Sequence, residues 1–415
     1  MKFGKYEITE LENGLRIISE YIPHFRSISL GLWIATGSRN ENEENNGITH
    51  LIEHLLFKGT KNKTYTDIAV AFDSMGAEYN AFTDKENTCV YADFIDTHLD
   101  RCASLLFDIV FNPSFLPENI EMEKKIINEE IQMVEDNPSE NIFNYFYREI
   151  FYNHPLRLPV LGNKHSLKKI NPAIIWDYFK ENFNLKNIVI SAAGNTRHGN
   201  LVEVVKKNLE NFKNISGGQR NNISKKKSVN RKVKKSFSTN TKAAHLCYGS
   251  VGCSRIDEKK YPLAIFTNIF GGSMSSRLFQ KIREEKGLSY SLYSINTYYA
   301  DTGTVATYAA TSYENLNQVI ELIEKEIKDI QEKGLKESEI RRAKENIKGN
   351  IVLGVEDISS RMFRLGKSLL MDKKVLTINE ILKKIDSIKG RKIDEMAHKY
   401  FEPENMSLII LAGKK

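Results

Sequence analysis

Two spacings of apolar residues alternate along the chain, and together they predict an α+β protein. An apolar residue at every second position marks strands, and Asn13-Gly14 is a pair that favours a tight hairpin turn. The expected hairpin and strands lie at 6–22, 26–37, 187–194, 245–252 and 303–311. Apolar residues three or four positions apart mark helices at 65–75, 96–111, 201–212, 261–270, 275–284, 316–332 and 337–352.

The two halves of the chain repeat one order of elements. Each begins with strands, continues with a helix that ends near a Phe and a Gly, and then has a hairpin and two amphipathic helices. Since 415 residues exceed what one hydrophobic core usually supports, two domains are expected. We predict an N-terminal domain at 1–212, a flexible basic linker at 213–237 and a C-terminal domain at 238–415.

The linker is predicted from a break in composition. A run of basic residues with few apolar neighbours is surrounded by glycine, asparagine and serine. The basic residues are Lys225, Lys226, Lys227, Arg231, Lys232, Lys234 and Lys235. Such a run suits either a nucleic-acid-binding patch or a solvated hinge. No aromatic residues lie between the charges, as base stacking would require, so we interpret the run as a hinge and expect no nucleic-acid partner.

Composition indicates a soluble globular protein with no membrane association. Apolar residues make up 41% and charged residues 27% of the chain, which carries a net charge of +7. No stretch has the eighteen or so consecutive apolar residues of a membrane span, and the first residues lack the apolar core of a signal peptide. The four cysteines form no C-x-x-C pair, which favours buried thiols and a cytoplasmic location.

The segment His50-Leu51-Ile52-Glu53-His54 carries the clearest chemical signal. A spacing of four residues is about one helical turn, so His50 and His54 project from the same face of a helix. Glu53 lies beside them, where a carboxylate could act on a metal-bound water. The alternative is a core helix whose histidines are satisfied by hydrogen bonds.

Two histidines do not complete a site, because a catalytic zinc usually takes three protein ligands. A helix predicted to begin at Pro117 offers carboxylates along the border of its apolar face. Glu123 and Glu130 lie seven residues apart, which is about two turns along one stripe. From the residues alone, Glu129 and Glu130 are equal candidates for the third ligand.

The segment 50–60 resembles the zinc motif of the pitrilysin/insulinase superfamily of inverted-motif zinc peptidases. It is most similar to the branch that contains the β subunit of mitochondrial processing peptidase and its bacterial relatives. The third ligand of that family corresponds to Glu130, and an outer glutamate that supports activity corresponds to Glu123. The resemblance continues in the segment 76–83, which is similar to the family's substrate-side strand, and in 283–290, which contains its arginine and tyrosine.

The resemblance implies a zinc metalloendopeptidase with one Zn²⁺ per chain on His50, His54 and Glu130. Glu53 is implied as the general base and then the general acid. The implied fold is α+β, with two similar domains related by duplication, each a mostly antiparallel mixed sheet with helices packed on one side. The second domain is expected to have no metal site, because Leu263, Phe266 and Thr267 align with His50, Glu53 and His54.

An extended peptide is the implied substrate, bound as an added strand. The residues expected to bind it on the family's substrate-side strand are Asn80, Ala81, Phe82 and Thr83. The alternative for Asn80 is a turn or hairpin residue. Arg283 and Tyr290 are implied to hold the substrate carbonyl and stabilise the oxyanion, although Arg283 taken alone suggests a surface ion pair.

Assembly is also implied by the resemblance. A chain of this length supplies half of the closed chamber of the family's double-length relatives. A homodimer in which Arg283 and Tyr290 act in trans is therefore expected. The alternative function is a non-catalytic partner subunit of a peptidase complex. The complete set of histidines and glutamates favours the peptidase.

Overall fold

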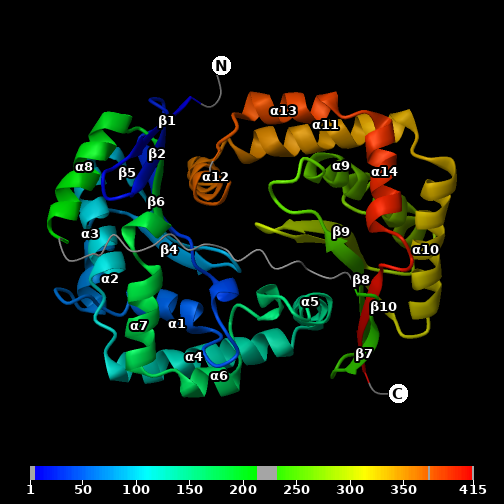
Figure 1. The fold of residues 1–415 in the computed structure, drawn as a ribbon, viewed down its shortest axis with the longest axis horizontal. Coiled ribbons are helices and arrows are strands. Elements are labelled where there is room, and N and C mark those ends of the chain that lie inside the picture. The colour runs from blue at the N-terminus through cyan, green and yellow to red at the C-terminus, as the bar shows by residue number, and fades with distance from the viewer. Residues whose placement is uncertain (1–4, 213–230, 373, 414–415) are drawn as a thin grey trace. The chain divides into compact units, whose positions relative to one another are not determined.

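The structure, a computed structural model, describes residues 5–212, 231–372 and 374–413. The chain divides into two compact units (Figure 1). The first contains the described residues within 1–131, 158–223 and 353–378, and the second those within 132–157, 224–352 and 379–415. Among the described residues, no helix is long and apolar enough to cross a membrane.

The first unit is built on a mixed sheet with the strand order β1-β2-β6-β3-β5-β4. Its strands are β1 (Tyr6–Glu10), β2 (Arg16–Tyr21), β3 (Ser27–Ile34), β4 (Glu78–Thr83), β5 (Thr88–Ile95) and β6 (Ile188–Gly194). Its helices are α1 (Ile48–Leu56), α2 (Tyr65–Asp73), α3 (Leu99–Phe111), α6 (Lys164–Lys169), α7 (Pro172–Asn182), α8 (His198–Glu210) and α12 (Ile358–Met371), together with most of α4 (Pro117–Glu135). The order leaves β4 at an edge, where it pairs with β5 from Glu78↔Asp93 to Thr83↔Thr88.

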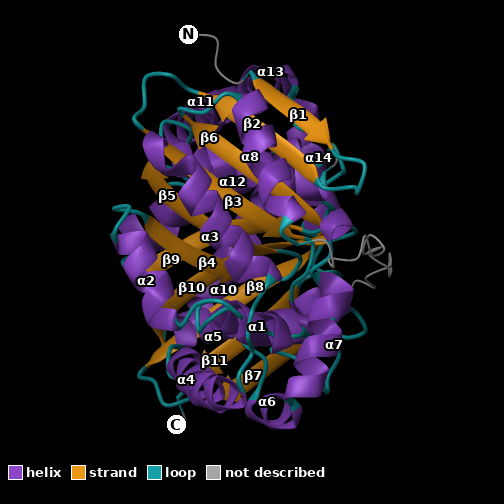
Figure 2. Ribbon diagram, turned by 90° about the vertical axis from the view of Figure 1, so that its left-hand side faces the viewer, coloured by secondary structure: helices purple, strands orange, loops and turns teal. Residues whose placement is uncertain are grey.

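The predicted hairpin and strands of this unit are present. β1 pairs antiparallel with β2 around the turn at Asn13-Gly14, and Gly14 adopts the positive φ of +87° that such a turn needs. β3 lies between β6 and β5 and is antiparallel to both, while β2 and β6 are parallel. The strands and the helices that cover them are distinguished by colour in Figure 2.

The central strand β3 is buried on both faces of its sheet. Ile28, Leu30, Leu32 and Ile34 belong to the core that contains α1 and α3. Because side chains alternate along a strand, Trp33 points to the opposite face, where it joins Met362 and Leu365 of α12 in a second cluster. In Figure 1 this orange helix lies beside the blue and green strands of the sheet. A helix from late in the sequence therefore completes the first unit.

The second unit repeats this plan with the strand order β7-β11-β8-β10-β9. Its strands are β7 (Lys234–Ser238), β8 (Ala243–Gly252), β9 (Ser291–Tyr298), β10 (Gly303–Ser312) and β11 (Ser407–Ala412). Its helices are α5 (Pro138–Ile150), α9 (Lys260–Phe270), α10 (Leu316–Lys333), α11 (Glu337–Gly354), α13 (Ile378–Ser387) and α14 (Gly390–Tyr400), with a π-helical turn at Phe279–Glu284 where an ordinary helix was expected. β7 and β11 are parallel, as β2 and β6 are in the first unit.

The second sheet is also covered on both faces. Ala244 and Leu246 lie in the core formed with α9, α10 and α14. Cys247 points to the other face and packs with Ile142 and Phe146 of α5. Each unit thus receives one covering helix from the other half of the sequence: α12 in the first and α5 in the second.

The observed units differ from contiguous domains at 1–212 and 238–415 because of this exchange of helices. Most of the expected linker, 213–230, lies outside the described residues. Its last part is a regular strand rather than a flexible segment, because Lys234 and Lys235 begin β7 and pair with Leu408 and Ile409.

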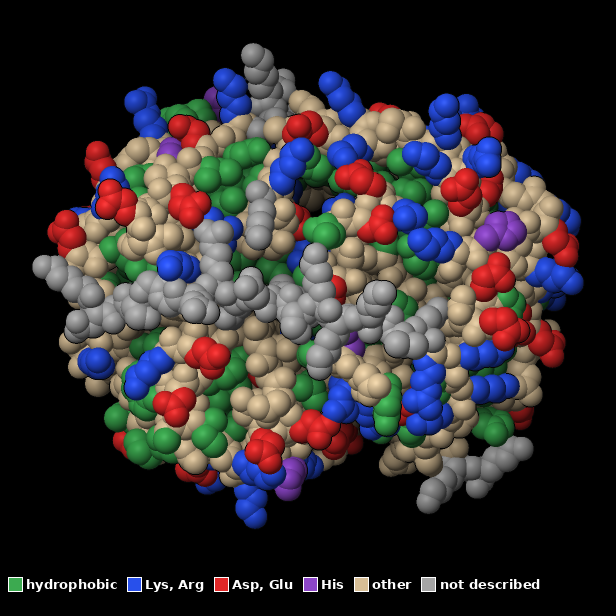
Figure 3. All heavy atoms as spheres, in the orientation of Figure 1, with side chains coloured by type: hydrophobic (Ala, Val, Ile, Leu, Met, Phe, Trp, Pro, Cys, Tyr) green, Lys and Arg blue, Asp and Glu red, His purple; other side chains and the backbone are tan. Residues whose placement is uncertain are grey.

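Lys, Arg, Asp and Glu side chains are interspersed on the face of the molecule seen in Figure 3.

Candidate metal centre

Helix α1 presents the histidine motif, and its N-terminus is formed by a glycine turn. Gly47 precedes the helix with a φ of +93°, and an added Cβ would lie 2.7 Å from the carbonyl oxygen of Leu161. Only glycine fits both conditions. The apolar face of the helix is buried through Leu51, Ile52, Leu55 and Leu56. This burial fixes the helix on the sheet and leaves His50 and His54 on a partly exposed side.

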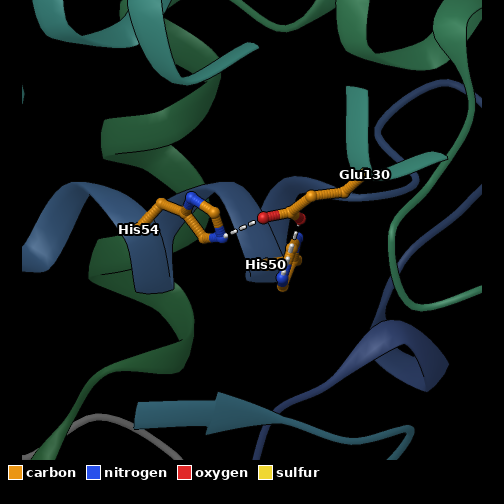
Figure 4. A group of neighbouring side chains, drawn as sticks. All are labelled: His50, His54 and Glu130. Carbon is orange, nitrogen blue, oxygen red and sulfur yellow. Dashed lines mark ion pairs between the residues drawn. The ribbon is translucent and has the colours of Figure 1, made fainter. Parts of the chain in front are cut away.

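The two imidazoles converge on one carboxylate from α4 (Figure 4). The Nε2 atom of His50 lies 3.9 Å from Oε2 of Glu130, and Nε2 of His54 lies 3.7 Å from Oε1 of the same side chain. The centres of the two imidazole rings are 4.6 Å apart. His50, His54 and Glu130 form the group of potential metal ligands found among the described residues. Glu129, the neighbour of Glu130, is exposed.

The donor set fits a zinc ion. Tetrahedral coordination with bonds of about 2.0–2.1 Å places ligand atoms roughly 3.4 Å apart, and the observed separations exceed that by only a few tenths of an ångström. Burial and the neighbouring His54 lower the pKa of His50 to about 3, so its ring is neutral at physiological pH. Neutral imidazole is the form that binds a metal. Two imidazoles and one carboxylate match a catalytic zinc site with a position left for water.

Glu53 lies on the same helix and does not belong to this ligand group. Its side chain is buried, and its Oε2 atom has no hydrogen-bond partner among the described residues. Burial raises the pKa of the Glu53 carboxyl, and a hydrogen bond with Thr83 acts in the opposite direction. A carboxylate with one unpaired oxygen at a metal site has the capacity to accept a proton from a water molecule.

Glu123, which the family resemblance implies as an outer partner of the ligands, lies behind His54. Its Oε2 lies 2.9 Å from Nδ1 of His54, and its Oε1 lies 2.7 Å from Nζ of Lys58. The carboxylate therefore holds the ring of His54 with Nε2 turned toward Glu130. Such partners of a ligating histidine orient the ring and increase its basicity.

The expected substrate strand is the edge strand β4, which packs against the motif helix. The Tyr79 ring lies 5.3 Å from that of Phe57 and stacks on Phe72 at 4.0 Å. Thr83 contacts Glu53, so the end of the strand reaches the histidine motif. The strand is paired on its β5 side, and no described strand pairs with its other edge.

Arg283 and Tyr290 belong to the second unit. Arg283 lies in the π-helical turn with its guanidinium 4.8 Å from the centre of the Phe279 ring and 3.8 Å from Oε1 of Glu284. Tyr290 directly precedes β9 and is 91% exposed. Both side chains are thus exposed to solvent.

Three contacts of the site were not anticipated from the sequence. Lys58 is part of the recognised motif, but its ion pair with Glu123 depends on the packing of α4 against α1. Thr83 was expected to touch substrate, and its contact with Glu53 depends on where β4 ends. Glu41 accepts hydrogen bonds at the start of α1, and nothing in its sequence surroundings distinguishes it from neighbouring acidic residues.

The sequence matches two family descriptions. Residues 16–164 match insulinase (peptidase family M16), and residues 169–347 match the peptidase M16 inactive domain. The first match contains all three potential metal ligands and Glu53. The second covers much of the half in which no metal site was expected.

Full-length relatives and solved structures agree with these matches. The protein YmxG of Bacillus subtilis, described as an uncharacterized zinc protease, is 35% identical over 405 residues, covering 97% of both chains. A zinc protease of Rickettsia bellii, also described as uncharacterized, is 33% identical over 408 residues, covering 98% of this chain and 97% of the relative. A protease from Helicobacter pylori has the same fold, with a TM-score of 0.89 at 18% identity over 99% of this chain and 100% of that structure. The chain therefore belongs to the insulinase family of peptidases, family M16.

Proposed function

We propose that this protein is a zinc metalloendopeptidase that hydrolyses peptide bonds in unstructured peptides. The observation that carries the proposal is the convergence of His50, His54 and Glu130 next to the buried carboxylate of Glu53. The descriptions of the relatives as zinc proteases support the same class of reaction.

The ligand group gives a metal ion a defined place. A zinc ion bound there would act as a Lewis acid that activates water and polarises a peptide carbonyl near neutral pH. The chain contributes one neutral ring in His50, a second ring held by Glu123 in His54, and the negative charge of Glu130. We propose one such ion per chain.

Glu53 is the proposed general base. It would take a proton from the attacking water and later deliver it to the leaving amine. Its unpaired Oε2 is the atom proposed to accept the proton, while the contact with Thr83 holds the rest of the carboxylate in place. Both roles require a carboxylate beside the ligands rather than among them.

The edge strand β4 is the proposed binding site for the peptide. An extended peptide can pair with a free sheet edge through main-chain hydrogen bonds, whereas a folded protein offers no free strand. In β4, Asn80, Ala81, Phe82 and Thr83 lie at this edge, and Thr83 contacts the proposed base. This placement supports a preference for peptides without stable structure.

Arg283 and Tyr290 are proposed to bind the substrate carbonyl in trans within a homodimer. The support is their resemblance to the family's arginine and tyrosine and the exposure of Tyr290. A fixed guanidinium fork and a phenol are suitable donors for a developing oxyanion. We also propose a cytoplasmic location, because all four cysteines are buried with free thiols.

The decisive experiment measures metal content and peptide cleavage in two variants. Glu53→Gln should bind zinc like the wild type, since no ligand is removed, but cleavage of an unstructured peptide should fall by roughly 10²- to 10⁴-fold. A His50→Ala/His54→Ala variant should lose the metal. Full zinc occupancy in that double variant would contradict the site, and a wild-type protein that binds zinc but cleaves no peptide would instead support a non-catalytic partner subunit.

A further inference from the structure

The segment 36–41 connects β3 to the turn before α1 and is unusually rich in buried polar side chains. Thr36, Ser38, Arg39 and Glu41 are all buried. Buried polar groups of this kind persist where they make specific hydrogen bonds. Two of these side chains bond in different directions: Glu41 toward the motif helix and Arg39 toward the turn of the β4–β5 hairpin.

Glu41 holds the N-terminus of the motif helix. Its Oε2 accepts hydrogen bonds from the backbone N–H of Gly47 at 2.8 Å and from Nδ2 of Asn46 at 2.7 Å, and its Oε1 accepts from the N–H of Thr49 at 2.9 Å. Gly47 has no side chain with which to cap the helix, so the carboxylate takes that role from a distance. His50 follows Thr49 directly, and its position in the first turn therefore depends on this carboxylate.

Arg39 holds the turn that carries the substrate strand. Its Nη1 lies 2.6 Å from Oε1 of Glu86, and both side chains are almost fully buried. Its backbone N–H donates to the carbonyl oxygen of Lys85 at 2.8 Å. The turn at 84–87 joins β4 to β5, and Gly37 packs so closely against Asp84 that an added Cβ would clash with its carbonyl oxygen.

We propose that Arg39 and Glu41 are positioning residues that set the substrate strand β4 and the metal-binding turn of α1 relative to each other. The inference rests on the proposed peptidase function. A peptide on β4 must present its scissile bond to the ligand group within about half an ångström, which demands a rigid connection between the two elements. Arg39 and Glu41 are two residues apart, and their charge-assisted hydrogen bonds are short and directional.

The proposal predicts that the two residues affect different measured quantities. Glu41→Gln replaces one acceptor oxygen with an amide donor that faces backbone N–H groups, so the first turn of α1 should shift. Zinc affinity of the metal-free protein should fall about tenfold or more, and the visible spectrum of the cobalt-substituted protein should change. Arg39→Lys removes the guanidinium that contacts Glu86, so KM for an unstructured peptide should rise about tenfold while zinc affinity stays within twofold.

Glu20→Gln is the matched control. Glu20 is a buried carboxylate of the same unit and lies 2.6 Å from Nη1 of Arg361; its ion pairs are with α12 rather than with α1 or the 84–87 turn. Its loss should lower the temperature of thermal unfolding and leave zinc affinity and KM within twofold. A folded Glu41→Gln protein with the wild-type zinc affinity and cobalt spectrum would overturn the proposal. The proposal would also be overturned if all three variants showed a lower zinc affinity together with a higher KM, because that pattern indicates general destabilisation.

Two further measurements keep the inference separate from the proposed function. If Glu41→Gln does not fold, Glu41→Asp, whose carboxylate is one methylene shorter, must show the weakened zinc binding, and wild-type affinity in this variant refutes the role. If the wild type binds zinc but cleaves no peptide, the proposed function fails alone. Zinc affinity and the dissociation constant for the peptide then test Glu41 and Arg39 directly.

Discussion

Replacing Glu123 with glutamine should weaken zinc binding through a residue that does not belong to the ligand group. Glu123 is buried, with one oxygen 2.9 Å from Nδ1 of His54 and the other 2.7 Å from Nζ of Lys58. Glutamine keeps the shape of the side chain but loses its charge and can offer an oxygen to only one of these partners. The amide nitrogen then faces either the imidazole or the ammonium group.

The magnitude follows from the contact with His54. Outer partners of a ligating histidine typically change metal affinity tenfold to a hundredfold, which corresponds to about 1.4 to about 2.7 kcal/mol of binding free energy. The ion pair with Lys58 adds less, because that lysine side chain is 30% exposed and its charge is screened by water. We therefore expect the zinc dissociation constant of Glu123→Gln to lie between these two limits.

The assay is competition for zinc between the metal-free protein and a chromophoric chelator. Glu129→Gln is the matched control, since Glu129 lies on the same helix next to Glu130 but is exposed. Its zinc affinity should equal that of the wild type. A Glu123→Gln protein whose dissociation constant stays within twofold of the wild type would refute the reasoning. An equal loss in Glu129→Gln would show that the charge of α4 as a whole, rather than the contact with His54, sets the affinity.

Three further outcomes are expected. Trp33→Ala should lower the free energy of unfolding by about 3–5 kcal/mol, because the ring is 1% exposed and packs against α12; a loss below about 1 kcal/mol in urea denaturation would contradict this packing. Unstructured peptides should be cleaved and a tightly folded protein should resist, as mass spectrometry of the products can establish; rapid cleavage at a rigid surface site would argue against binding by strand addition. Mixing inactive Glu53→Gln protomers with inactive Arg283→Ala/Tyr290→Phe protomers should restore activity, because one site of the mixed dimer is intact. Absence of activity despite labelled proof of subunit exchange would exclude action in trans.

Much of the fold could be predicted because its signals are local. The hairpin at Asn13-Gly14 depends on the backbone freedom of one dipeptide, and the helical spacing in α1 depends on four successive residues. The start of α4 at Pro117 follows from the ring of that residue, which suits the first turn of a helix. Such features need no knowledge of the rest of the chain.

The third member of the metal-binding group, Glu130, could not be identified from its local sequence alone. Glu129 and Glu130 are neighbours of the same type on one helix, and their own chemistry does not distinguish them. The family resemblance selected Glu130, and the structure turns that side chain toward His50 and His54 while Glu129 faces solvent. The difference is which face of α4 packs against the core that contains α1, and this depends on the apolar residues of both helices.

The sequence by itself determined the elements with a clear periodicity, the repeated plan and the residues capable of holding a metal, because periodicity and side-chain chemistry are properties of short segments. Only the tertiary structure decided that α12 covers one face of the first sheet and α5 one face of the second. Both of these sheet faces are apolar, and nothing local specifies which helix covers them. It also decided that Arg39 and Glu41 face the hairpin turn and the motif helix. Those contacts join residues that are separated along the chain, and their existence depends on the packing of all the elements between them.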